Sequence, residues 1–162
     1  MKEKKRRVFF TLMFALVLYV TGAYFVEAFV NYPSWRMIGA TEFRAYHNAL
    51  GARIIPFMVV PWFFEIALTF FLMRFRPRAV PLRAIVLAQV FNLVALASSI
   101  FIQIPIQIQF GNNGMSVQAL DRLIETDPIR WVSFILKLVV YLWMMMRLVT
   151  SDDIAREFEQ KY

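Results

Sequence analysis

Four long apolar stretches alternate with short polar connections along this chain of 162 residues. They span about 8–31, 53–74, 83–108 and 131–150, close to the roughly 20 residues with which an α-helix crosses about 30 Å of hydrocarbon. The pattern predicts an all-α protein, an integral membrane four-helix bundle. The connections are too short for a second, soluble domain, so we expect one transmembrane domain over residues 1–162.

Each apolar stretch carries a file of polar side chains at helical spacing. The files are Thr21, Tyr24, Glu27 and Asn31; then Trp62, Glu65 and Thr69; then Gln89, Asn92, Ser99, Gln103 and Gln107, with Leu96 in the gap; and finally Arg130, Ser133, Lys137 and Tyr141. Steps of three and four residues put each file on one helix face. Because polar groups in hydrocarbon are costly unless they meet a partner or water, we expect the four files to face a shared interior.

The composition and the placement of charge agree with a membrane protein. The chain is 60% hydrophobic and 18% charged, whereas soluble domains are about 45–50% apolar and about 25% charged. Of the 18 Lys and Arg, twelve lie within 1–7, within 74–83 and from 147 onward, and five lie at the opposite ends of the stretches. The positive-inside rule then predicts that both termini are cytoplasmic. We expect the lipid bilayer, and no nucleic acid, as the partner of these basic residues.

The first outer connection predicts a short helix over 42–50. Thr41 is a candidate N-cap, and Gly51 is a candidate C-terminal stop. In the second outer connection, Ser116 predicts the start of a short helix that ends near Glu125.

Three further signals concern helix shape and helix ends. Pro61 removes a backbone hydrogen bond to residue 57 and predicts a kink in the second span. Asp127 followed by Pro128 predicts the start of the fourth span, as N-cap and first helical residue. In the tail, Ile154, Phe158 and Tyr162 form an apolar stripe that predicts a short helix on the cytoplasmic interface.

Charged residues within the spans are the first candidates for chemistry. Glu27 and Lys137 fall at similar predicted depth, which suggests an ion pair that is either functional or a structural tie between helices. Glu65 and Asn92 share a level near the midplane, and an intramembrane carboxyl is a candidate catalytic group. We therefore take Glu65 as a candidate catalytic residue, and Glu27, Asn92 and Lys137 as candidate ligand-binding residues.

His47 is the only histidine, and the chain contains no cysteine. These counts exclude disulfides, thiolate metal sites and the paired Glu-x-x-His motifs of di-iron bundles, so we expect neither a metal nor a cofactor. His47 is a candidate catalytic proton acceptor at a cavity mouth, or else an interfacial residue that caps the outer helix. Trp35 either lines a pocket or belongs to an interfacial aromatic belt.

Several short motifs occur together in the outer half of the chain. They are Trp35, Phe43 and His47 before the second span, Gln103, Pro105 and Gln107 at the end of the third, and Leu123, Ile124, Thr126, Ile129 and Arg130 at the start of the fourth. This set resembles a group of small four-helix bacterial membrane proteins related to the anthrone-oxygenase-like family. That family typically has Asn-x-Pro-x-Asn at the end of the third helix, where this chain has glutamines at both amide positions.

The resemblance implies a location in the bacterial inner membrane and a cofactor-free oxygenase-like activity. It also implies that His47, Gln103, Gln107 and Arg130 lie nearest the site. Gln103, Gln107 and Arg130 therefore join the candidate ligand-binding residues. Trp35 joins them through its interpretation as a pocket residue.

Two functional hypotheses remain open from the sequence. The first is a polar outer-leaflet pocket that binds a lipophilic small molecule, with or without catalysis. Its basis is the grouping of Glu27, His47, Gln103, Gln107, Arg130 and Lys137 in the outer half. The alternative is a non-enzymatic accessory or scaffolding subunit, in a homo-oligomer or a larger membrane complex, in which the polar files only tie the helices together.

Overall fold

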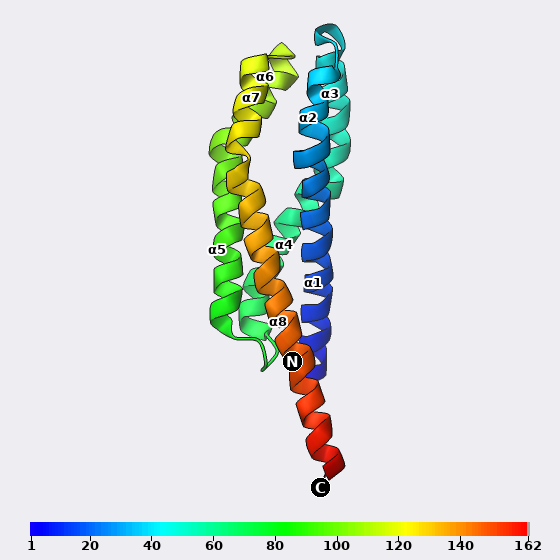
Figure 1. The fold of residues 1–162 in the computed structure, drawn as a ribbon, viewed down its shortest axis with the longest axis vertical. Coiled ribbons are helices and arrows are strands. Elements are labelled where there is room, and N and C mark those ends of the chain that lie inside the picture. The colour runs from blue at the N-terminus through cyan, green and yellow to red at the C-terminus, as the bar shows by residue number, and fades with distance from the viewer. Residues whose placement is uncertain (162) are drawn as a thin grey trace.

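The computed structural model describes the backbone of residues 1–161 and the side chains of residues 1–151. The described chain is an elongated helical bundle (Figure 1). Four runs, Glu3–Met37, Ala40–Phe75, Leu82–Asn113 and Val117–Ser151, are long and apolar enough to cross a membrane. The predicted all-α four-helix bundle and its multi-pass membrane character are therefore confirmed.

Each run joins several helical segments. The first contains α1 (Glu3–Val26), the π-helical turn η1 (Glu27–Asn31), α2 (Tyr32–Ser34) and the 3₁₀ turn η2 (Trp35–Met37). The second contains α3 (Ala40–Ile54), the π turn η3 (Ile55–Val59) and α4 (Val60–Phe75). The third contains α5 (Leu82–Ser98), the π turn η4 (Ser99–Gln103) and α6 (Ile104–Asn113), and the fourth contains α7 (Val117–Thr126) and α8 (Pro128–Lys161).

Each of the three π turns is followed by a proline at the same offset. Pro33, Pro61 and Pro105 stand two residues after η1, η3 and η4 end. Proline has no N–H, and its ring collides with the carbonyl four residues earlier, so an undisturbed α-helix cannot pass through it. In η3 the N–H of Val60 reaches back to the carbonyl of Ile55, and this wider turn makes room for the ring.

The disturbance predicted at Pro61 is thus present as a π turn. The chain changes direction between α3 and α4 (Figure 1). The carbonyl of Phe57, which loses its helical donor to Pro61, accepts a hydrogen bond from the Tyr19 hydroxyl at 2.6 Å. A side chain of α1 therefore satisfies the backbone group that the proline leaves unpaired.

The predicted first outer helix is not a separate element. α3 starts after Gly39, not at a Thr41 cap, and it continues through Gly51 into the second span. The Thr41 hydroxyl instead donates to the Glu42 carboxylate at 2.7 Å. One glycine costs a helix only about 1 kcal/mol, so it does not end a helix that is supported on both sides.

The predictions for the fourth run are confirmed in part. The Ser116 hydroxyl caps α7 by accepting the N–H of Ala119 at 3.3 Å, and α8 begins at Pro128. The backbone of α8 continues to Lys161, so the tail is not a separate helix. The predicted stripe of Ile154, Phe158 and Tyr162 lies outside the residues whose side chains are described.

The half of the bundle that holds the N-terminus and the α4–α5 connection, here called the terminal half, is tightly packed. On α5, Ala84 and Ala88 are buried one turn apart against α8. Small side chains let two helices in a membrane approach closely. Phe10 of α1 stacks on Tyr141 of α8 with ring centres 6.1 Å apart, which closes this half around an apolar core.

A buried polar cluster lies next to this core, on the side away from the N-terminus, and joins α4, α5 and α8. The Lys137 ammonium lies 2.9 Å from the Glu65 carboxylate and donates to Oδ1 of Asn92 at 3.1 Å. Asn92 Nδ2 donates to Glu65 Oε1 at 3.0 Å, and Trp62 Nε1 donates to Asn92 Oδ1 at 3.3 Å. Glu65 is 0% exposed, and Lys137 and Asn92 are 1% exposed. We call these four residues the midplane cluster.

The midplane cluster corrects one sequence prediction and confirms another. The ion pair predicted between Glu27 and Lys137 is wrong, because Lys137 pairs with Glu65, and Glu27 accepts a hydrogen bond from Asn31. The shared level of Glu65 and Asn92 is confirmed by their hydrogen bond. Glu65 is consequently a carboxylate paired with Lys137 and Asn92.

Breaking the Lys137–Glu65 pair on one side should destabilise the fold strongly. Glu65→Gln leaves the ammonium of Lys137 buried without its counter-charge, which typically costs about 3–5 kcal/mol. The double variant Glu65→Met with Lys137→Met should cost less than Glu65→Gln, since no unpaired charge remains. Denaturant unfolding of the detergent-solubilised protein measures this, with Glu125→Gln, at an exposed position of α7, as the matched control. A Glu65→Gln variant as stable as the control would contradict the structural role of the pair.

Candidate functional site

A cavity of about 810 Å³ occupies the opposite half of the bundle, here called the distal half. Its walls come from all four helical runs. Trp62 and Phe134 line it at the end nearest the midplane cluster, where the Lys137 ammonium lies 4.3 Å from the centre of the Phe134 ring. These two rings therefore separate the cavity from Glu65, Asn92 and Lys137.

The cavity opens sideways between the second and third helical runs. Ile55 and Phe63 from the second run, and Ile104 and Ile108 from the third, line the cavity and are also 47–58% exposed on the surface of the bundle. Both runs are long and apolar enough to span a membrane. The opening is thus framed by apolar side chains on the flank of the bundle that faces lipid in a membrane.

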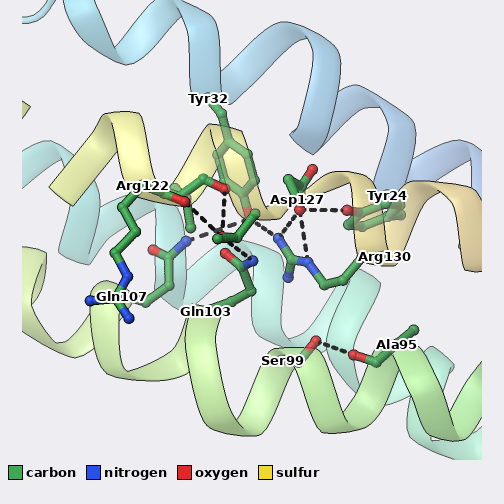
Figure 2. Close-up of polar contacts among 11 residues, drawn as sticks. Tyr24, Tyr32, Ala95, Ser99, Gln103, Gln107, Arg122, Asp127 and Arg130 are labelled. Carbon is green, nitrogen blue, oxygen red and sulfur yellow. Dashed lines mark hydrogen bonds and ion pairs between the residues drawn. The ribbon is translucent and has the colours of Figure 1, made fainter. Parts of the chain in front are cut away.

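Arg130 and Asp127 form the buried charged centre of the distal half (Figure 2). The Arg130 guanidinium donates to one Asp127 oxygen, from Nε at 2.8 Å and from Nη2 at 2.5 Å. The Tyr24 hydroxyl donates to the same oxygen at 2.7 Å, and the Tyr32 hydroxyl accepts from Arg130 at 3.1 Å. The sequence indicated Asp127 only as a helix cap, but its carboxylate neutralises Arg130 and ties α8 to α1.

Gln107 connects this centre to His47. The Gln107 amide Nε2 donates to the Tyr32 hydroxyl at 3.5 Å, and its Oε1 lies 2.7 Å from His47 Nε2 (Figure 2 shows Gln107 and Tyr32). With the amide nitrogen committed to Tyr32, the oxygen must accept, so His47 carries its proton on Nε2. In the neutral imidazole, Nδ1 is then a hydrogen-bond acceptor.

Aromatic rings hold His47 in place. Trp35, Phe43 and Phe110 surround its imidazole, with ring centres 5.4, 5.9 and 5.7 Å away. Trp35, Phe43 and Phe110 are at most 1% exposed. The orientation of the only histidine is thus fixed by packing on three sides and by Gln107 on the fourth.

Gln103 is oriented in a similar way by α7. Its Nε2 donates to the Thr126 hydroxyl at 3.0 Å, and that hydroxyl donates to the Arg122 carbonyl at 2.6 Å (Figure 2). The amide nitrogen is therefore used, and the amide oxygen remains as an acceptor. Gln103 is 1% exposed and lines the cavity.

Three buried polar atoms at the cavity wall have no hydrogen-bond partner among the described residues. They are Trp35 Nε1, His47 Nδ1 and Gln103 Oε1. Nearly all buried polar groups in folded proteins are paired, and an unpaired one costs about 1–3 kcal/mol. The residues of all three atoms line the cavity, but neighbouring side chains cover the atoms themselves, so a bound molecule would reach them only after a side chain moves.

The structure brings together some of the predicted site residues and leaves the others apart. Among the predicted site residues, those that line the cavity are Glu27, Trp35, His47, Gln103, Gln107 and Arg130. Glu65, Asn92 and Lys137 lie in the midplane cluster, where they bind one another. The proposed grouping of Lys137 with the outer residues is therefore wrong, whereas the remaining residues of that group do share one cavity.

Sequence reasoning missed Tyr32 and Asp127 as parts of this site. Tyr32 lies eight residues after Tyr24, which is a helical spacing that could have extended the polar file of the first span. Asp127 stands three residues before Arg130, a spacing at which opposite charges pair on a helix. Both spacings are visible in the sequence. However, Asp127 was interpreted as a helix cap, and Tyr32 lies just beyond the predicted end of the first span.

Comparisons of the chain with protein-family models, with curated proteins and with solved structures gave no match. The resemblance to the anthrone-oxygenase-like family therefore stays a prediction.

The proton position on His47 is open to direct measurement, because a chain with a single histidine gives one set of ring signals. In protein labelled with ¹⁵N-histidine, NMR at a pH at which the imidazole is neutral should show a protonated Nε2 and an unprotonated Nδ1. Gln107→Leu removes the acceptor and should produce a mixture of tautomers, whereas Gln109→Leu, exposed on the same helix, should change nothing. A proton on Nδ1 in the unaltered protein would contradict the assigned hydrogen-bond network.

Proposed function

We propose that this protein binds a lipophilic small molecule in the distal cavity. The molecule enters from the bilayer through the opening between the second and third helical runs. Its apolar body lies against Met58, Trp62 and Phe134, and its polar end meets Glu27, His47 and Arg130. The observation that supports this most strongly is a mainly apolar, laterally open cavity that has a few polar side chains in its wall.

The size of the cavity agrees with this function. Small-molecule sites in proteins usually measure about 300–1,000 Å³ and combine apolar walls with a few fixed polar groups. The cavity volume of about 810 Å³ falls within this range. His47 and Gln103 are held in place before any ligand arrives, so a ligand would not have to supply the free energy of ordering them.

We further propose that both termini face the cytoplasm, in the inner membrane of a bacterium. Twelve of the 18 Lys and Arg belong to the N-terminal segment, the α4–α5 connection and the segment from 147 onward. This bias supports the orientation through the positive-inside rule. In this orientation the cavity lies in the outer leaflet half, and the bacterial origin follows the resemblance noted above.

Filling the cavity should abolish binding. Gly51 lies on the lining face of α3, one turn after His47, and a Cβ there would have no neighbouring group of the described structure within 4 Å. Gly51→Phe should therefore place a ring in the cavity without a clash. Gly22, on α1 away from the cavity, has equally open surroundings, so Gly22→Phe is a matched control.

The measurement is mass spectrometry of lipophilic molecules that stay bound through purification in a mild detergent. The unaltered protein and Gly22→Phe should retain the same apolar molecule, and Gly51→Phe should lose it. Equal retention by all three proteins would contradict a site in this cavity. Retention of a larger protein complex, with no small molecule in any of them, would favour the scaffolding alternative.

A further inference from the structure

The cavity wall changes from apolar to polar along α3 and α6, toward the end of the bundle away from both termini (Figure 1). In the second run the lining positions follow one another in steps of three and four residues, as Arg44, Asn48, Gly51 and Ile55, and in the third run they include Asn112, Gly111, Ile108 and Ile104. Steps of three and four residues lie on one helix face. The wall is therefore apolar at the lateral opening and polar about 16 Å farther along the helix.

Two glycines keep the wall open between its polar and apolar parts. A Cβ at Gly51 would have no neighbouring group of the described structure within 4 Å. A Cβ at Gly111 would lie 3.1 Å from Oδ1 of Asn48 and 3.9 Å from Nδ1 of His47, so α6 approaches α3 closely at this glycine. The polar end of the wall is thus continuous with the space beside His47. We call Arg44, Asn48 and Asn112, which are all exposed, the distal rim.

Arg44 is a cation that is fixed in place and has free donors. Its Nε donates to the carbonyl of Gly111 at 3.1 Å, which orients the guanidinium. Among the described residues its two terminal nitrogens have no hydrogen-bond or ion-pair partner, and neither do the side-chain amides of Asn48 and Asn112. A guanidinium binds a carboxylate or a phosphate through two parallel hydrogen bonds. The distal rim therefore presents the donors that such an anion requires.

No carboxylate of the described wall competes for this cation. Glu27 is the one carboxyl that lines the described part of the cavity, and it is buried on η1. Glu42 lies on α3 two residues before Arg44, on another face of the helix, and accepts a hydrogen bond from the Thr41 hydroxyl. The charge of Arg44 is consequently balanced only by solvent or by a bound anion.

We propose that the molecule bound in the cavity is an amphiphile with an anionic head group, a carboxylate or a phosphate, which the distal rim holds. Its polar end continues past His47 to Arg44. Its chain passes Gly51 and lies in the apolar part of the cavity, with its far end at Trp62. This inference depends on the proposed function, because it names the chemical class of the ligand for the same cavity.

Probes with one chain and different head groups test this assignment. 12-Bromododecanoate and 12-bromododecyl phosphate carry an anion, and 12-bromododecanol carries a hydroxyl. Bromine quenches the fluorescence of a tryptophan that it contacts, and Trp62 lines the inner end of the cavity. The protein is held in nanodiscs of zwitterionic lipid, at an alkaline pH that ionises the carboxyl group. Quenching that also occurs in Gly51→Phe is subtracted, which removes the signal of probes dissolved in the bilayer.

Arg44→Gln should weaken the binding of both anions about fivefold, which is the effect of a well-oriented exposed ion pair, and should leave the alcohol unchanged. Arg53→Gln is the matched control, because Arg53 is also exposed on α3 but does not line the cavity. It should change none of the three affinities. Each probe is compared with itself across the proteins, so differences in partition between probes do not enter.

The outcomes separate the two proposals. If Arg44→Gln weakens the alcohol as much as the anions, or affects the anions no more than Arg53→Gln does, the anionic head group is overturned while the cavity still binds lipophilic molecules. If no probe gives quenching that Gly51→Phe removes, the proposed function fails with it. An Arg44-dependent signal supports the proposal for either anion, and the anion that binds more tightly assigns the head group to a fatty acid or to a phosphate ester.

Discussion

The buried contact of Lys137 with Glu65 and Asn92 is the interaction on which the arrangement of this bundle depends. A lysine and a glutamate in the middle of apolar helices are tolerated only if they meet each other and their remaining hydrogen-bonding groups are satisfied. Asn92 satisfies both at once, since its amide donates to Glu65 and accepts from Lys137. This requirement fixes the rotation of α4, α5 and α8 about their axes, so that all three polar files face inward.

The midplane cluster divides the bundle into two halves with different properties. The terminal half is closed by small residues on α5 and by the stacked rings of Phe10 and Tyr141. In the distal half, prolines require a π turn in each of the first three runs, and η1, η3 and η4 all contribute to the cavity wall. A packed half thus supports an open one, in which oriented polar groups surround a lateral cavity.

Helical periodicity was sufficient to predict which side chains face the interior, because burial in a membrane depends mainly on which face of a helix a residue occupies. Glu65, Asn92, Gln103 and Lys137 are all at most 1% exposed. Periodicity did not predict their partners. Depths counted from the predicted span ends were inaccurate, since the second helical run begins at Ala40 and α8 continues to Lys161. The prediction placed Lys137 level with Glu27, whereas in the structure it lies level with Glu65.

In this arrangement the distal half of the bundle is hollow and accessible from the bilayer, whereas the terminal half is solid. The chain has no cysteine, so single cysteines can be introduced without background. Gly51→Cys faces the cavity, and Ala88→Cys, in place of a residue that is 0% exposed, lies in the packed half. In protein reconstituted in lipid vesicles, an apolar maleimide should label Gly51→Cys rapidly and Ala88→Cys only after unfolding. Equally slow labelling at both positions would contradict the account, because it would mean that the helices close over the space in which a ligand is proposed to bind.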